Sequence, residues 1–108
     1  MNRECEKAMR FTIPAVRVAV SRALSKEHGM SETLIANRLG IAQAAVSKYI
    51  SGNYSKRVAR IVGAVVLQKA HLPVVKEILK NGKAGRVSEL IDRAASGDEL
   101  VAFALGKG

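Results

Sequence analysis

The sequence is poor in cysteine, proline and aromatic residues, and these shortages limit the kinds of fold and site that the chain can form. A single cysteine, Cys5, among 108 residues excludes an internal disulfide framework and a metal site with several cysteine ligands. Aromatic residues make up only 4% of the chain, so its core must be built from Val, Ile, Leu and Ala. Because 48% of the residues are hydrophobic, the chain is globular rather than disordered. With two prolines, this composition predicts one all-α domain over residues 1–108.

Long apolar runs are also missing. The first ten residues, MNRECEKAMR, are charged and lack the apolar segment of a signal peptide. No apolar run approaches the roughly 20 residues that a membrane-spanning helix needs. We therefore expect a cytoplasmic protein with no membrane partner.

Acidic residues are half as numerous as basic ones. The chain carries 18 Lys and Arg against 9 Asp and Glu, which gives a net charge of +9. Residues 1–57 hold ten of the basic residues and four of the acids, and residues 58–108 hold eight and five. Such an excess attracts polyanions, although a merely soluble basic surface is an alternative interpretation. Its concentration in the first half favours nucleic acid as the partner.

The most informative stretch is SETLIANRLGIAQAAVSKYISG, from Ser31 to Gly52. Its first half predicts a short amphipathic helix over Glu32–Leu39, with Ser31 as the N-cap and Gly40 as the residue that ends it. A second helical pattern follows over residues 43–51, after a turn of only two further residues. The apolar positions of the two patterns are Leu34, Ile35, Leu39, Val46, Tyr49 and Ile50.

Two short helices joined by a glycine-containing turn are typical of the helix-turn-helix, whose second helix lies in the DNA major groove. The pattern turns Gln43, Ala44, Ser47 and Lys48 outward on this second helix. Gln pairs with adenine, Lys with guanine or phosphate, Ser with several base edges, and the Ala methyl can meet a thymine methyl. We predict that these four residues read bases. A purely structural helical hairpin is the alternative.

The segment from Cys5 to Asn53 resembles the helix-turn-helix of the lambda Cro/repressor (XRE) superfamily. The sequences CE, IPAVR and LGIAQAAVSKYISGN within it are most similar to a group of short archaeal predicted transcriptional regulators. The resemblance implies a repressor-like bundle and a dimeric DNA-binding regulator. One departure is Ala42, since that family usually has a capping Thr or Ser before the recognition helix. Losing this cap costs roughly 1 kcal/mol and removes a phosphate contact.

The same resemblance implies that the loop after the recognition helix runs beside the DNA backbone. Lys56, Arg57 and Arg60 cluster at this point, and a solvated charge run is the ordinary explanation of such a cluster. On the resemblance we instead predict phosphate contacts, because these positions follow the motif directly. The predicted phosphate contacts are Ser31, Arg38, Asn53, Tyr54, Lys56 and Arg57.

Further helical patterns surround the motif. Residues 1–11 are charged, and we expect them to be partly ordered at best. Residues 12–70 form the predicted DNA-binding core, and residues 72–105 form an extension that either completes the core or builds a dimer interface. The predicted helices outside the motif are Thr12–His28, Val58–Ala70, Val74–Lys80, Val87–Ala95 and Glu99–Leu105, the last with Asp98 as its cap.

No arrangement of residues suggests catalysis. The sequence lacks a nucleophile with its base, paired carboxylates, a phosphate-binding loop and any metal-ligand spacing. His28 and His71 are interpreted as helix-end residues, and Cys5 as a small packing residue or a loose thiol. We thus predict no enzyme, no metal and no cofactor, and no residue indicates a small-molecule effector.

The sequence as a whole predicts a sequence-specific transcriptional regulator that binds double-stranded DNA as a homodimer. An antitoxin-like module that binds a protein partner through residues 72–105 is one alternative. Non-specific DNA compaction by an architectural protein is another.

Overall fold

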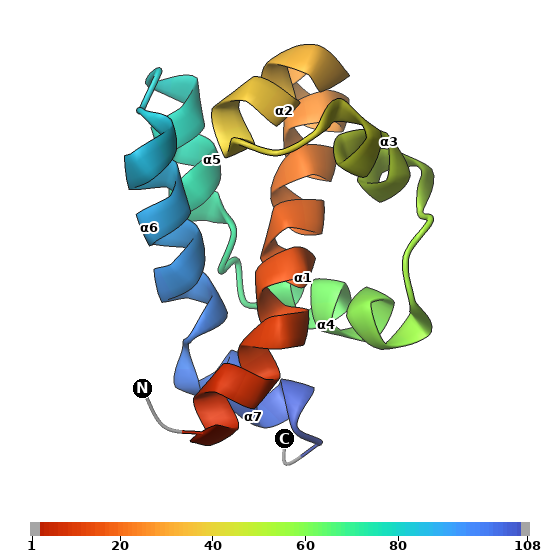
Figure 1. The fold of residues 1–108 in the computed structure, drawn as a ribbon, viewed down its shortest axis with the longest axis vertical. Coiled ribbons are helices and arrows are strands. Elements are labelled where there is room, and N and C mark those ends of the chain that lie inside the picture. The colour runs from red at the N-terminus through yellow and green to blue at the C-terminus, as the bar shows by residue number, and fades with distance from the viewer. Residues whose placement is uncertain (1–2, 107–108) are drawn as a thin grey trace.

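The structure is a computed structural model and describes residues 3–106. These residues form seven α-helices and no strand, which confirms the predicted all-α fold class (Figure 1). The helices are α1 Arg3–His28, α2 Glu32–Leu39, α3 Gln43–Ser51, α4 Lys56–Leu67, α5 Leu72–Leu79, α6 Ala84–Ala95 and α7 Asp98–Ala104.

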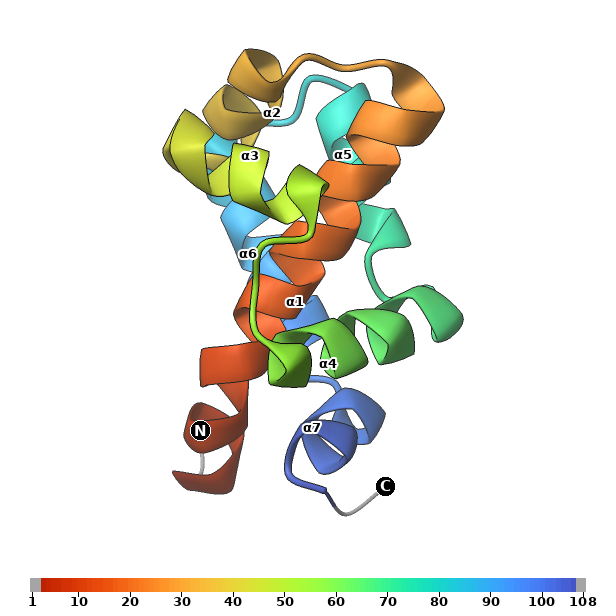
Figure 2. The same ribbon diagram turned by 90° about the vertical axis from the view of Figure 1, so that its right-hand side faces the viewer.

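Helix α1 is the central element, and it contacts each of the other six helices (Figures 1 and 2). Val16, Val20 and Leu24 are completely buried, because their i, i+4, i+8 spacing places them on one side of the helix. Alanines at intervening positions widen the buried surface and let the neighbouring helices approach closely.

The expectation that residues 1–11 are only partly ordered is wrong for residues 3–11, while residues 1–2 lie outside the described part of the chain. Helix α1 begins at Arg3 rather than at Thr12, so Pro14 lies inside the helix. A proline there removes a hydrogen bond and crowds the preceding turn, at about 3 kcal/mol. Figure 2 shows the first turns of α1 tilted away from the rest of the helix. Burial of Ala8 and Met9 in the core offsets the cost of continuing the helix through Pro14.

Cys5 is half-buried in these added turns and packs against the core. Its thiol lies 3.8 Å from the sulfur of Met9, one helical turn further along. This placement agrees with the interpretation of Cys5 as a small packing residue.

The C-terminal helices complete the core of the chain. Helices α5 and α6 lie side by side next to α1, α6 also contacts α2, and α7 packs against α1 and α4 (Figure 1). Residues 72–105 therefore pack into the same core as the earlier helices. The buried residues of this extension are Val74, Val75, Ile78, Val87, Ile91, Ala95, Leu100 and Ala104.

Several predicted helix ends are shifted. Helix α4 starts two residues earlier than predicted and ends at Leu67, where the chain turns through Lys69 at φ 58°. Asp98 is not the cap of the last helix, because Gly97 occupies that position and Asp98 is already helical. An acidic side chain in the first turn still stabilises the positive end of the helix dipole.

His71 stands at the start of α5, as expected for a helix-end residue, but its side chain is buried. Burial lowers the pKa of His71 below its usual value, and the negative charge of Glu27 acts in the opposite direction.

Within residues 3–106, no single helix is both long and apolar enough to cross a membrane. Helices α4 and α5 meet the same criterion only as a pair bent by 76°.

Candidate nucleic-acid interface

Helix α2 begins and ends as its sequence predicts. The Ser31 hydroxyl accepts a hydrogen bond from the backbone N–H of Leu34 at 3.2 Å, which makes Ser31 the N-cap. Gly40 adopts φ 69°, and its N–H bonds to the carbonyls of the last turn. Ile35 and Leu39 are buried, but Leu34 is 39% exposed, although the sequence pattern counted it with them.

The turn between α2 and α3 provides no side-chain cap for the first backbone N–H groups of α3. Ala42 holds the N-cap position with an extended backbone, and its side chain caps nothing. The backbone N–H groups of Gln43 and Ala44 find no acceptor among residues 3–106. Free N–H groups at a helix N-terminus can donate to a phosphate.

The two sides of α3 differ as the sequence predicted. Val46 is completely buried, and Ile50 is half-buried against the same core. The opposite side is exposed and contains all four predicted base-reading residues, which the structure brings together on one solvent-facing surface. These residues, called the α3 face below, are Gln43, Ala44, Ser47 and Lys48.

An arginine of α1 holds the other end of α3. Arg22 is half-buried, and its Nη1 donates to the carbonyls of Tyr49 at 3.3 Å and Ile50 at 3.0 Å. These carbonyls belong to the last turn of α3, where a positive charge also favours the helix dipole. The sequence analysis assigned no role to Arg22. The sequence gives no signal for it, since donor and acceptors lie 27 and 28 residues apart.

Replacing this arginine should loosen helix α3. Arg22→Met keeps the aliphatic stem but loses two charge-assisted hydrogen bonds, so we expect the free energy of unfolding to fall by about 2 kcal/mol. Lys26→Met is the matched control, because Lys26 is exposed one turn further along α1. Chemical denaturation and hydrogen exchange of residues 43–51 measure the effect. Equal losses in both variants would show that the Arg22 contacts contribute nothing specific.

The predicted phosphate contacts lie at four positions in the structure. Ser31 is exposed at the start of α2, with its hydroxyl already accepting the capping bond. Asn53 is exposed and Tyr54 half-exposed in the segment after α3, where the N–H of Asn53 bonds to the carbonyl of Lys48. Figure 2 shows this segment running from α3 to the start of α4.

Arg38 is turned toward a different part of the molecule. Its Nη2 donates to the side-chain oxygen of Asn81, in the turn between α5 and α6, at 2.9 Å. The side chain is half-buried, and its Nε has no hydrogen-bond partner within the described residues. In this arrangement Arg38 joins α2 to the C-terminal helices and is not free to extend toward a ligand.

Lys56 and Arg57 open α4, which Ser55 caps through the N–H of Val58. The Arg57 guanidinium lies 4.0 Å from the ring centroid of Phe11 and donates to the carbonyl of Ala104 at 3.4 Å. Helix α4 packs against α1 and α7, whereas α3 packs against α1 and α2. Arg57 is thus held on a neighbouring part of the surface rather than beside the α3 face, and Lys56 is exposed next to it at the start of α4.

The cations near α3 and α4 are not neutralised by neighbouring carboxylates. Within residues 3–106, both ion pairs lie on α6, where Glu89 contacts Arg86 and Arg93. Lys48, Lys56 and Arg57 therefore have no carboxylate partner among the described residues, and their positive charges can attract an anionic ligand.

No group of three or more His, Cys, Asp or Glu side chains that could hold a metal ion occurs in residues 3–106. In comparisons with protein-family models, with curated proteins and with solved structures, nothing matches this chain.

Proposed function

We propose that the protein is a sequence-specific transcriptional regulator that binds double-stranded DNA. In this proposal α2 and α3 act as a helix-turn-helix, and α3 is the recognition helix in the major groove. The observation that carries the proposal is the α3 face. Its three polar side chains and the Ala44 methyl are exposed together on a helix that Val46 and Arg22 hold from the opposite side.

Each residue of the α3 face has a chemical role in this proposal. Gln43 can pair with adenine through two hydrogen bonds, and Lys48 can donate to guanine. Ser47 can donate or accept at a base edge, and the Ala44 methyl suits a thymine methyl. The free N–H groups at the start of α3 and the exposed Ser31, Asn53 and Tyr54 would position the helix through phosphates.

The net charge of +9 supports a polyanionic partner and favours fast association with DNA. We propose a homodimer, since two recognition helices about 34 Å apart would read successive turns of the major groove. Such a regulator would act in the cytoplasm, on DNA that is accessible there.

Selection from a pool of random duplex DNA at physiological salt tests this function. A palindromic consensus with half-sites about one helical turn apart is the expected result. Strong, salt-sensitive binding with no enriched sequence would replace the proposal by a non-specific architectural role. Complete absence of binding would exclude DNA as the partner.

Substitution of two lysines should distinguish a residue that reads bases from one that contacts phosphates. Lys48→Ala is expected to weaken binding to the selected sequence by about 1–3 kcal/mol and to relax preference at one base position. Lys56→Ala should weaken binding to selected and random DNA by the same factor. Fluorescence anisotropy titrations with both DNAs measure the two ratios. Equal losses on both DNAs for both variants would contradict this assignment of roles.

A further inference from the structure

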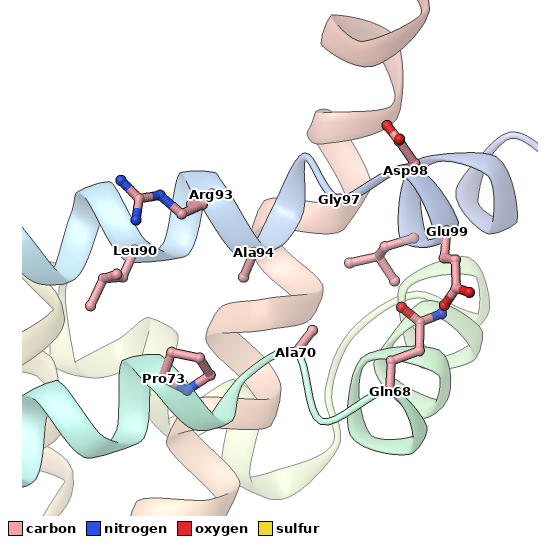
Figure 3. Close-up of a pocket in the computed structure, with 10 residues that line it drawn as sticks. Gln68, Ala70, Pro73, Leu90, Arg93, Ala94, Gly97, Asp98 and Glu99 are labelled. Carbon is pink, nitrogen blue, oxygen red and sulfur yellow. The ribbon is translucent and has the colours of Figure 1, made fainter.

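A groove opens between the α4–α5 turn and the ends of α6 and α7. Its volume is about 430 Å³, far above the roughly 30 Å³ that one water occupies, so it admits an aliphatic side chain. Figure 3 shows Pro73, Leu90 and Ala94 pointing into the groove, while Arg93 and Asp98 point away from it. Gln68 and Glu99 face each other at one end. The groove is therefore apolar along its length and polar at its rim.

The most exposed large hydrophobic side chain among the described residues stands next to this groove. Leu67 is 84% exposed at the end of α4, and Val66 beside it is 50% exposed. Gln68, the next residue in the chain, already lines the groove. A protruding leucine and an apolar recess thus adjoin each other in one surface patch.

We propose that this patch is the homodimer interface, in which Leu67 of each copy enters the groove of the other. A two-fold axis makes a contact reciprocal, so one patch that contains both a protrusion and a recess can pair with itself. The proposal deepens the proposed function, which requires a dimer, and it names the surface through which the dimer forms.

Charge complementarity favours a second copy as the occupant. A chain with a net charge of +9 repels its own copies, so a stable contact needs local acidic groups. Glu99 provides one at the α7 side of the groove, and it forms no ion pair within residues 3–106. Lys69 is exposed two residues after Leu67. In the proposed dimer, entry of Leu67 into the partner's groove brings Lys69 toward this carboxylate.

The test uses the full chain without DNA, so it does not depend on the proposed function. Sedimentation equilibrium over a concentration series should show a dimer for the wild type. Leu67→Ser removes one buried leucine from each half of the interface, so we expect the dimer Kd to rise about 100-fold. The matched control is Leu79→Ser, since Leu79 is also exposed, at 44%, but does not line the groove. Thermal unfolding of each variant establishes that it is folded.

A charge exchange tests the same interface without altering its apolar part. Glu99→Lys places like charges opposite Lys69 and should raise the dimer Kd several-fold. Adding Lys69→Glu to that variant should restore the wild-type Kd. A cleft that accepts a different protein or a small ligand would not respond in this reciprocal way.

Three results would overturn the interface. They are a wild type that stays monomeric up to about 100 µM, a Leu67→Ser variant that dimerises as the wild type does, and equal weakening by Leu67→Ser and Leu79→Ser. Failure of the proposed function looks different. A dimer that depends on Leu67 but selects no DNA sequence would support the interface and contradict the proposed regulator function. A selected palindrome bound by a dimer that does not depend on Leu67 would support the regulator function and contradict the interface.

Discussion

Ile35→Ala is expected to lower the free energy of unfolding by about 3 kcal/mol, a large part of the 5–15 kcal/mol typical of a small domain. Ile35 is completely buried in α2, and Met30 packs against the same core just before this helix. Truncation would leave a cavity where α2 contacts α1 and α3. Urea denaturation with a two-state fit measures the loss.

The neighbouring leucine is the control for this experiment. Leu34 is 39% exposed, so Leu34→Ala should change the free energy of unfolding by only about 0.5 kcal/mol. The two variants also test which side of α2 faces the core, because the sequence pattern alone counted both residues as apolar positions of one helix. A larger loss for Leu34→Ala than for Ile35→Ala would mean that α2 buries its other side.

Local signals account for what the sequence predicted correctly. The caps Ser31 and Gly40 and the period of the apolar residues defined α2 to the residue, and Gly52 did the same for the end of α3. The exposure of the α3 face followed from the same periodicity, because helix geometry fixes which side chains share a side.

What the sequence missed depends on contacts between distant residues. Helix α1 continues through Pro14 because residues before it are buried against other helices, a gain that no local pattern reveals. Arg22 reaches carbonyls 27 and 28 residues away, and Arg38 reaches Asn81 across 43 residues. A long, charged side chain has no sequence signature that separates a solvent-facing position from a structural one.

If the protein binds DNA as proposed, the salt dependence of its affinity should reveal which of the predicted phosphate contacts exist. Each phosphate neutralised by a cation contributes about −0.9 to the slope of log affinity against log salt. If Lys56 and Arg57 of both protomers make such contacts, the slope is about −3.6, and affinity falls about 150-fold between 50 and 200 mM salt. Addition of Arg38 from both protomers would steepen it to about −5.4, a fall of about 2,000-fold.

We expect the smaller slope, because Arg38 is half-buried and donates to Asn81, whereas Lys56 and Arg57 are both exposed at the start of α4. Arg38→Ala should then leave the slope unchanged, although it removes a link between α2 and the C-terminal helices. Lys56→Ala, at an exposed position, should reduce the slope by about 1.8, since each dimer loses two contacts. Anisotropy titrations of both variants at four or more salt concentrations measure these slopes. If Arg38→Ala also flattens the dependence, the arginine must leave Asn81 when DNA binds, and the joint between α2 and the C-terminal helices must then open in the complex.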